Sequence, residues 1–128
     1  MDMSDNIGSL SDIGGLLTDT YRSMETIFGE RMVSVILFGS YARGDYDAES
    51  DVDIAVLVDC SREELVQYHP AIVAQMSRFM MEYDRLISVT DIPIADFDAY
   101  KKALPFYRNI DEEGVRLSAS LHTPPSPV

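Results

Sequence analysis

Cysteine and histidine are scarce in this sequence, which contains one cysteine, Cys60, and two histidines. A single cysteine excludes an internal disulfide, and so few thiolate and imidazole groups exclude a metal site built from them. No charged segment followed by an apolar stretch opens the sequence, and no apolar run approaches the roughly 18 residues of a membrane span. We therefore expect a soluble protein of the reducing cytoplasm, without a membrane segment.

Basic residues are scarce as well, because 10 Lys and Arg stand against 22 Asp and Glu, a formal net charge of -12. Phosphate backbones repel such a surface, so we expect no direct contact with nucleic acid. Two interpretations of the acidity stay open. It either serves solubility alone or steers a basic protein partner by opposite charge.

The length of 128 residues corresponds to one domain with one core. Hydrophobic residues make up 46% and charged residues 25% of the sequence, which is typical of a soluble globular protein. Residues 118–128 (SASLHTPPSPV) contain three prolines and little to bury, so we predict a disordered tail there. The predicted domain covers residues 9–117.

Periodic apolar residues predict the elements of the first half. From Leu10 to Phe28 they recur every three or four positions, which indicates an amphipathic helix ending near Gly29. Residues 32–38 (MVSVILF) and 52–58 (VDIAVLV) are short, β-branched and almost wholly apolar. Both segments are typical of buried strands.

In the second half of the sequence, residues that begin or interrupt helices predict the element boundaries. Ser61 with Glu64 forms a capping-box signature that begins a helix. Pro70 predicts a break near His69 and the start of a second helical piece. Residues 86–89 are a candidate third strand.

The last predicted elements are two helices and an edge strand. Asp96 is expected to cap a helix through Leu104, and Pro105 to begin a helix that ends at Gly114 in the left-handed conformation. Residues 115–117 are expected to add an edge strand. This order of elements predicts an α/β (α+β) fold in which helices flank a small mixed sheet.

The segment between the first two strands carries groups suited to phosphate. Gly39 lets the backbone turn sharply and approach a ligand closely. Ser40 adds a hydroxyl where backbone N–H groups at the start of a helix favour a phosphate, and Arg43 can donate several hydrogen bonds to phosphate oxygens. We predict that these three residues bind the phosphate groups of a ligand.

Two aspartates open the second strand after ten intervening residues. Asp51 and Asp53 point to the same face of that strand, with Cα atoms about 6.7 Å apart. Carboxylate oxygens suit Mg²⁺, and two such ions about 3.5–4 Å apart stabilise the attacking and leaving oxygens of a displacement at phosphorus. We therefore predict that this pair binds Mg²⁺ and is catalytic.

The spacing of Gly-Ser, ten residues and Asp-x-Asp resembles the signature of the polymerase-beta-like nucleotidyltransferase superfamily. The fuller string GSYARGDYDAESDVDIAVLV is most similar to its minimal nucleotidyltransferases, short proteins that accompany HEPN-domain toxins in prokaryotic toxin-antitoxin pairs. The resemblance covers roughly residues 30–117.

This resemblance implies the superfamily fold, a triphosphate bound by Gly39 and Ser40, and metal ions bound by Asp51 and Asp53. In the best-described members it also implies transfer of AMP from ATP onto a tyrosine of the HEPN toxin. For this sequence we accordingly expect a Mg²⁺-dependent nucleotidyltransferase that uses ATP, modifies a protein hydroxyl and acts as the antitoxin of such a pair.

Family members usually carry a third carboxylate on a neighbouring strand, but this sequence has Ser88 at the expected position. The predicted substitute is Asp84, which has the same strand parity but lies roughly 13 Å further back along a strand. Asp91 and Glu82 are weaker candidates. The alternative function is therefore a catalytically degenerate nucleotide-binding module that neutralises a partner protein by binding alone.

Two further classes of nucleotidyltransferase are disfavoured. Antibiotic nucleotidyltransferases generally need an additional helical domain to hold the drug, and 128 residues leave no room for one. Polymerases that extend RNA tails are disfavoured for the same reason and by the negative charge.

Overall fold

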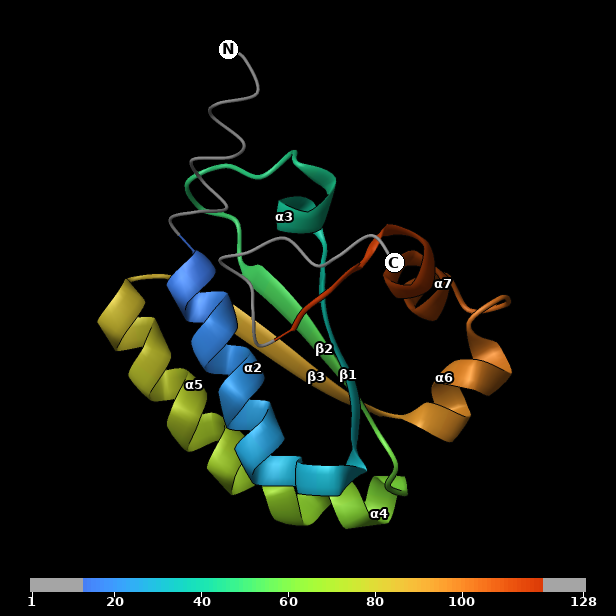
Figure 1. Cartoon of the computed structure of the whole chain (residues 1–128). Coiled ribbons are helices and arrows are strands. Elements are labelled where there is room, and N and C mark those ends of the chain that lie inside the picture. The colour runs from blue at the N-terminus through green and yellow to red at the C-terminus, as the bar shows by residue number, and fades with distance from the viewer. Residues whose placement is uncertain (1–12, 119–128) are drawn as a thin grey trace.

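A computed structural model describes residues 13–118 and contains a four-stranded sheet in the order β3-β2-β1-β4 (Figure 1). The strands are β1 (Met32–Phe38), β2 (Val52–Val58), β3 (Ile87–Pro93) and β4 (Val115–Arg116). The helices are α2 (Gly14–Phe28), α3 (Ser40–Arg43), α4 (Arg62–Leu65), α5 (His69–Tyr83), α6 (Ile94–Tyr100) and α7 (Pro105–Glu113). Short 3₁₀ turns cover Gly29–Arg31 and Val66–Tyr68.

The sheet is mixed, as predicted. Strand β1 runs antiparallel to β2 on one side and to β4 on the other. Strand β3 runs parallel to β2, because α4 and α5 carry the chain back along the sheet before β3 begins. The two central strands, β1 and β2, are the apolar segments that the sequence predicts with these same bounds.

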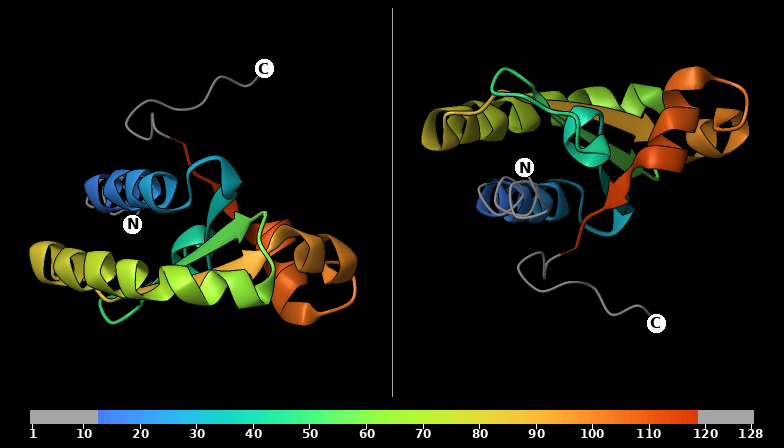
Figure 2. Two further views of the ribbon diagram at one scale, coloured as in Figure 1. Left: turned by 90° about the horizontal axis from the view of Figure 1, so that it is seen from below. Right: turned by 90° about the horizontal axis from the view of Figure 1, so that it is seen from above.

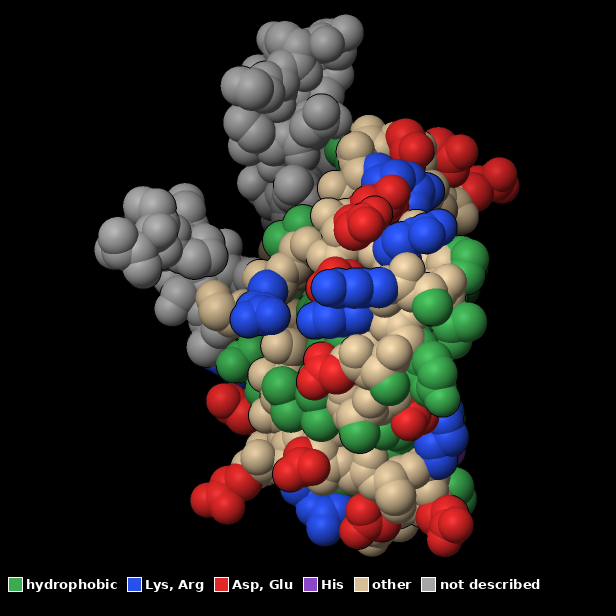
Figure 3. Space-filling view, turned by 90° about the vertical axis from the view of Figure 1, so that its right-hand side faces the viewer, with side chains coloured by type: hydrophobic (Ala, Val, Ile, Leu, Met, Phe, Trp, Pro, Cys, Tyr) green, Lys and Arg blue, Asp and Glu red, His purple; other side chains and the backbone are tan. Residues whose placement is uncertain are grey.

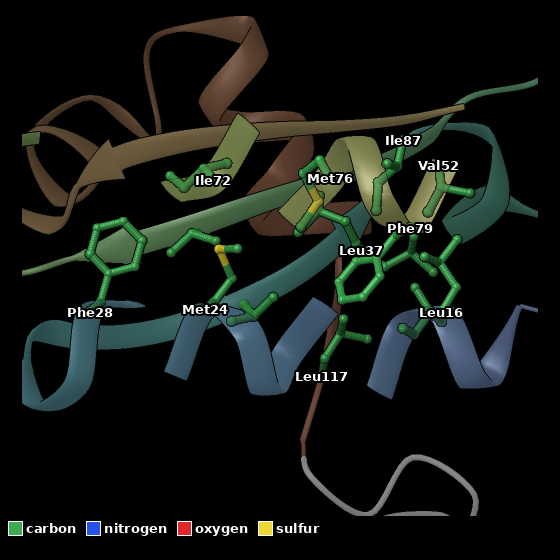
Figure 4. Packing of buried hydrophobic residues seen from close by; sticks show 14 of the residues in the cluster. Leu16, Met24, Phe28, Leu37, Val52, Ile72, Met76, Phe79, Ile87 and Leu117 are labelled. Atoms are coloured by element: carbon green, nitrogen blue, oxygen red, sulfur yellow. The ribbon is translucent and has the colours of Figure 1, made fainter. Parts of the chain in front are cut away.

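Helices cover both faces of the sheet. Figures 1 and 2 show α2 and α5 on one side and α6 and α7 on the other. The larger core lies under α2 and α5 and is drawn in Figure 4. Its labelled members are Leu16, Met24, Phe28, Leu37, Val52, Ile72, Met76, Phe79, Ile87 and Leu117. The smaller core under α6 and α7 contains Ile36, Ala55, Leu57, Ile92, Phe97 and Ile110.

The predicted break between α4 and α5 is confirmed. The Ser61 hydroxyl accepts the Glu64 N–H at 3.1 Å, and the Glu64 carboxylate accepts the Ser61 N–H at 2.9 Å. Helix α4 ends after one turn, a 3₁₀ turn follows, and α5 begins at His69 with Pro70 in its first turn. Proline is tolerated there because the first N–H groups of a helix have no intrahelical partner.

Three predicted boundaries were wrong. Strand β3 continues beyond the predicted residues 86–89 as far as Pro93, because its polar residues stay in register with β2. Helix α6 begins at Ile94, so Asp96 lies inside its first turn, where its carboxylate contacts the Arg62 guanidinium at 3.0 Å. Helix α6 also ends at Tyr100, because residues 101–104 form a turn before α7.

Gly114 ends α7 as predicted, but its conformation differs from the prediction. Its φ of -70° and ψ of 150° are extended rather than left-handed. The position instead excludes a side chain, because a Cβ atom there would overlap the Ile110 carbonyl oxygen and the Ile36 side chain. Close packing of the end of α7 onto β1 therefore explains this glycine.

Some predictions fall outside the described residues. These are the start of the first helix before residue 13, the first four residues of the predicted domain, and residues 119–128 of the predicted tail. The described part of the first helix, α2, begins at Gly14. None of the helices between residues 13 and 118 has the length and apolar character needed to span a bilayer.

Candidate active site

The end of β1 and the start of β2 bring Gly39 against Asp53. Antiparallel pairing sets Phe38 opposite Asp53, so Gly39 follows immediately beside that carboxylate. The backbone of Gly39 has φ 77° and ψ -155°, a region that favours glycine, and a Cβ atom there would overlap the Asp53 carboxylate. Gly39 therefore meets a conformational and a steric requirement at once.

The loop after Gly39 is ordered by contacts of its own. Ser40 begins the single turn of α3, which closes at Gly44 in the left-handed conformation. The buried ring of Tyr41 stacks on Tyr46 with centroids 4.5 Å apart and planes inclined by 4°. Asp47 accepts the Glu49 N–H at 2.8 Å, which tightens the turn before β2. The loop thereby holds Ser40 and the start of β2 at the same end of the sheet.

The two predicted metal ligands lie at this end of β2. Asp51 is exposed just before the strand, whereas Asp53 is half-buried within it. Burial raises the pKa of Asp53, and the negative charge of Asp51 raises it further, while the nearby Arg43 lowers it. The structure thus brings two mutually repelling carboxylates together, an arrangement that a cation relieves.

Arg43 is held by carboxylates in this structure. Its Nε donates to Asp45 at 3.3 Å, and its Nη1 lies 3.5 Å from Glu113 at the end of α7. The hydrogen bond that Arg43 donates to Asp45 is the main cause that raises the pKa of Arg43, with Glu113 contributing less. The predicted phosphate ligand therefore links the Gly39 loop to α7, a connection that the sequence does not signal.

Ser88 lies beside Asp53. Parallel pairing of β2 and β3 sets these two residues opposite each other, so both side chains project from the same face of the sheet. That face also carries Ala55 and Leu57, which pack under α6 and α7 further along β2. Ser88 is exposed, so the position predicted for a third acid is occupied by an accessible hydroxyl.

Asp84 lies between α5 and β3. It is the residue after α5, it has φ 53° and ψ 46°, and it is exposed. Between residues 13 and 118 no three His, Cys, Asp or Glu side chains form a group that could hold a metal ion. Asp91 pairs with Val56, faces α5, and contacts the His69 ring nitrogen at 2.8 Å. Catalysis by Asp84 stays a prediction.

The open part of this sheet face is bordered by α6 and α7. Figure 3 looks onto the side of these helices and shows acidic and basic side chains next to one another over its upper half. Hydrophobic side chains lie between the charges and along one margin. The face combines carboxylates, a guanidinium and exposed apolar surface, which are the groups needed to hold a charged ligand with an apolar portion.

Comparison with known proteins agrees with this arrangement. The nucleotidyltransferase domain family matches residues 21–122. The protein MJ0141 of Methanocaldococcus jannaschii, named for protein adenylyltransferase activity, is 36% identical over 104 residues, which are 80% of this chain and 95% of that protein. MJ0604 of the same organism, named in the same way, is 29% identical over 72% of this chain and 84% of its own length.

Two solved structures share the fold. One is described as a toxin-antitoxin with AMP-PNP, with 16% identity and a TM-score of 0.50. The other is described as a mutant of the toxin-antitoxin MntA-HpeT, with 15% identity and a TM-score of 0.51. Each similarity covers 80% of this chain and 73% of the other chain.

The mixed sheet and the family match together identify the chain as a nucleotidyltransferase. The chain belongs to the nucleotidyltransferase domain family, and it is similar to the two Methanocaldococcus jannaschii proteins above.

Proposed function

We propose that this protein transfers a nucleoside monophosphate, AMP from ATP, to a hydroxyl group of another protein in a Mg²⁺-dependent reaction. The observation that carries the proposal is the contact of Gly39 with Asp53, with Asp51 beside it, at an open end of the sheet. A triphosphate needs backbone that it can approach, and metal-assisted transfer needs paired carboxylates. This one corner of the fold offers both.

The residues present fit Mg²⁺. Burial and the negative charge of Asp51 raise the pKa of Asp53, and a divalent cation that binds both carboxylates removes the cost of holding these charges together. Asp51 and Asp53 would hold the ion, which supplies charge neutralisation for the phosphates when bound. Gly39 and Ser40 would receive the β- and γ-phosphates, and Arg43 would exchange its carboxylate partners for phosphate oxygens.

The reaction is an in-line displacement at the α-phosphorus. The oxygen of the acceptor hydroxyl forms a bond to that phosphorus, while the bond from phosphorus to the oxygen bridging to the β-phosphate breaks. Pyrophosphate leaves, and the hydroxyl proton is released to water. The protein positions the reacting groups and stabilises the charge of the phosphates, so no nucleophilic residue of this chain is required.

A protein acceptor is the finer part of the proposal. Two archaeal relatives are named for protein adenylyltransferase activity, and two structures of the same fold are described as toxin-antitoxin. The sequence resemblance adds a HEPN-type toxin as the partner. The net charge of -12 disfavours nucleic acid as the acceptor, and we propose that this antitoxin acts in the cytoplasm.

We propose Asp84 as the third acid, and its backbone offers a sharp test. Asn tolerates the left-handed conformation that Asp84 adopts, so Asp84→Asn removes the charge without backbone strain. Transfer should fall while ATP binding persists. Unchanged transfer would remove Asp84 from the mechanism.

The alternative, binding without transfer, is favoured by the hydroxyl of Ser88 beside Asp53. A serine cannot supply the charge of a carboxylate. In that case the nucleotide would bind through Asp51 and Asp53, and the protein would neutralise its partner by contact alone.

One experiment separates the two functions. The protein and the partner that co-purifies with it are incubated with α-³²P-ATP and Mg²⁺, beside Asp53→Asn and a matched control, Asp59→Asn. Asp59 is exposed and follows the opposite end of β2, so its loss should change nothing. A labelled band retained in the control and lost in Asp53→Asn supports transfer. Bound ATP without label supports the alternative, and absence of ATP binding contradicts both.

A further inference from the structure

An aromatic surface adjoins the aspartate pair on the same face of the sheet. Phe38 lies opposite Asp53 on β1, so the two side chains project side by side. The Phe106 ring, from the first turn of α7, meets the Phe38 ring edge-on with centroids 5.6 Å apart and planes at 86°. Apolar rings thus border Asp53 on the side opposite Ser88.

Phe106 is not needed to attach α7 to the core. Ile110 is the residue of α7 that is buried, at 1% exposure, whereas Phe106 is 47% exposed. Between residues 13 and 118, Tyr100 and Phe106 are the aromatic residues classed as exposed, and Phe106 is the one whose ring contacts the neighbour of Asp53. The exposed face of the Phe106 ring is therefore available to a ligand bound beside Asp53.

We propose that Phe106, supported by Phe38, stacks on the base of the bound nucleotide. The inference rests on the proposed function, which sets the α-phosphate at Asp51 and Asp53 and the other phosphates at Gly39. The ribose separates the base from the α-phosphate, so the base must lie close to the aspartates but outside their charged surroundings. A base that lies over β1, next to Phe38, meets this condition. The acceptor hydroxyl can then approach Asp53 from the opposite side, over Ser88 on β3.

Stacking depends on the area of the base and not on the hydrogen-bond donors and acceptors along its edge. Every base has a π-face, and stacking on an aromatic ring is therefore tolerant of base identity. The larger purine ring covers more of Phe106 than a pyrimidine does. We expect purine nucleotides to bind more tightly than pyrimidine nucleotides, and ATP and GTP to bind with similar affinity through this contact.

Phe106→Ala is the first test, with Leu104→Ala as the matched control. Leu104 is 45% exposed and precedes the same helix, but its aliphatic side chain offers no aromatic face to a base. Binding of ATP and of inorganic tripolyphosphate is measured by calorimetry with Mg²⁺. We expect Phe106→Ala to weaken ATP about tenfold and to leave tripolyphosphate within about twofold, since stacking of one base is worth roughly one power of ten or more. Leu104→Ala should change neither.

An introduced indole gives direct evidence of stacking. The sequence has no tryptophan, so Phe106→Trp carries the single indole of the chain. ATP should quench its fluorescence, and tripolyphosphate should not. Phe106→Tyr, which keeps an aromatic face, should retain ATP affinity.

Each contrary outcome has a separate meaning. Equal weakening of ATP and tripolyphosphate in Phe106→Ala would overturn the base site and indicate a general disturbance of the phosphate site. Unchanged ATP binding together with loss of the co-purifying partner would overturn it in favour of protein docking. If the wild-type protein binds tripolyphosphate as tightly as ATP, the base site fails while the proposed phosphate site stands. If it binds neither, both proposals fail.

Discussion

Ser88 on β3 lies directly opposite Asp53 on the parallel strand β2, and both side chains project from one face of the sheet. The hydroxyl is exposed, so a longer or charged side chain at this position has room to extend. The pair joins a residue that we propose as a Mg²⁺ ligand with the residue at the position where the sequence resemblance predicts a third carboxylate. Substitution of Ser88 can therefore test catalysis separately from nucleotide binding.

Ser88→Asp is expected to increase transfer several-fold and to make it more dependent on Mg²⁺. The new carboxylate adds a third negative charge beside Asp53, which should lower the thermal midpoint without metal and increase its rise with metal. Transfer of label and thermal unfolding with and without Mg²⁺ measure both effects. Ser88→Asn is the uncharged control, and a midpoint lowered equally by both variants would show that the position tolerates no larger side chain.

Gly39→Ala is expected to abolish nucleotide binding and to destabilise the fold by about 1–3 kcal/mol. Its methyl group would overlap the Asp53 carboxylate, and its φ of 77° disfavours any residue with a Cβ atom. The control is Gly14→Ala at the start of α2, where an added Cβ atom meets no other residue within 4 Å. Denaturant unfolding and ATP titration test the pair. Full ATP binding by Gly39→Ala would contradict the assigned geometry.

Asp53→Asn is expected to raise the metal-free thermal midpoint near neutral pH. Burial and the charge of Asp51 raise the pKa of Asp53, so the folded protein binds this proton more tightly than the unfolded chain does. The stability that results is present below the ordinary Asp pKa of about 3.9 and is lost as pH rises through the higher folded pKa.

Thermal unfolding in chelator at several pH values tests this sign. The difference between wild type and Asp53→Asn should be small in acid and should grow toward neutral pH, where the wild type carries the full cost of the charge. Added Mg²⁺ should raise the midpoint of the wild type alone. A variant that is less stable at neutral pH would give Asp53 a structural role instead.

Glu113→Gln is expected to strengthen triphosphate binding by up to about fivefold. The carboxylate of Glu113 competes with phosphate for Arg43 across 3.5 Å, and solvent screening keeps the interaction between two such exposed charges weak. The matched control is Glu112→Gln, because Glu112 is also exposed but has no ion pair among the described residues. Tripolyphosphate titration at low salt measures the effect. Weaker binding in Glu113→Gln would mean that Glu113 positions Arg43 for phosphate rather than competing with it.

Local sequence was sufficient for the parts of the site that are close in the chain. The apolar run of β1 is followed by Gly39, the apolar run of β2 contains Asp53, and two antiparallel neighbours joined directly by residues 39–51 must meet at their connected ends. The conformation of Gly39 and its contact with Asp53 follow from that meeting. Hydrophobic burial on both faces also explains why the bounds of these two strands were predicted correctly.

Contacts between distant segments were not predictable in this way. Arg43 meets Glu113, and Phe38 meets Phe106, only because α7 packs back onto β1 near its end. No local pattern marks either partner, since glutamate at a helix end and phenylalanine after proline are common for other reasons. The full length of β3 was missed for a related cause. Its polar residues, including Asp91 bonded to His69, interrupt the apolar signal that sequence analysis follows.

The β1–β2 hairpin contains every residue that we assign to phosphate and metal, while Ser88 arrives on a strand that enters the sheet after a long crossover. The proposed phosphate and metal ligands therefore lie in one structural unit, and the position opposite Asp53 lies in another. We therefore expect a substitution confined to β3 to change transfer while the hairpin still holds its nucleotide. An enzyme and a nucleotide-bound binding protein with this fold would then differ by substitutions in one edge strand.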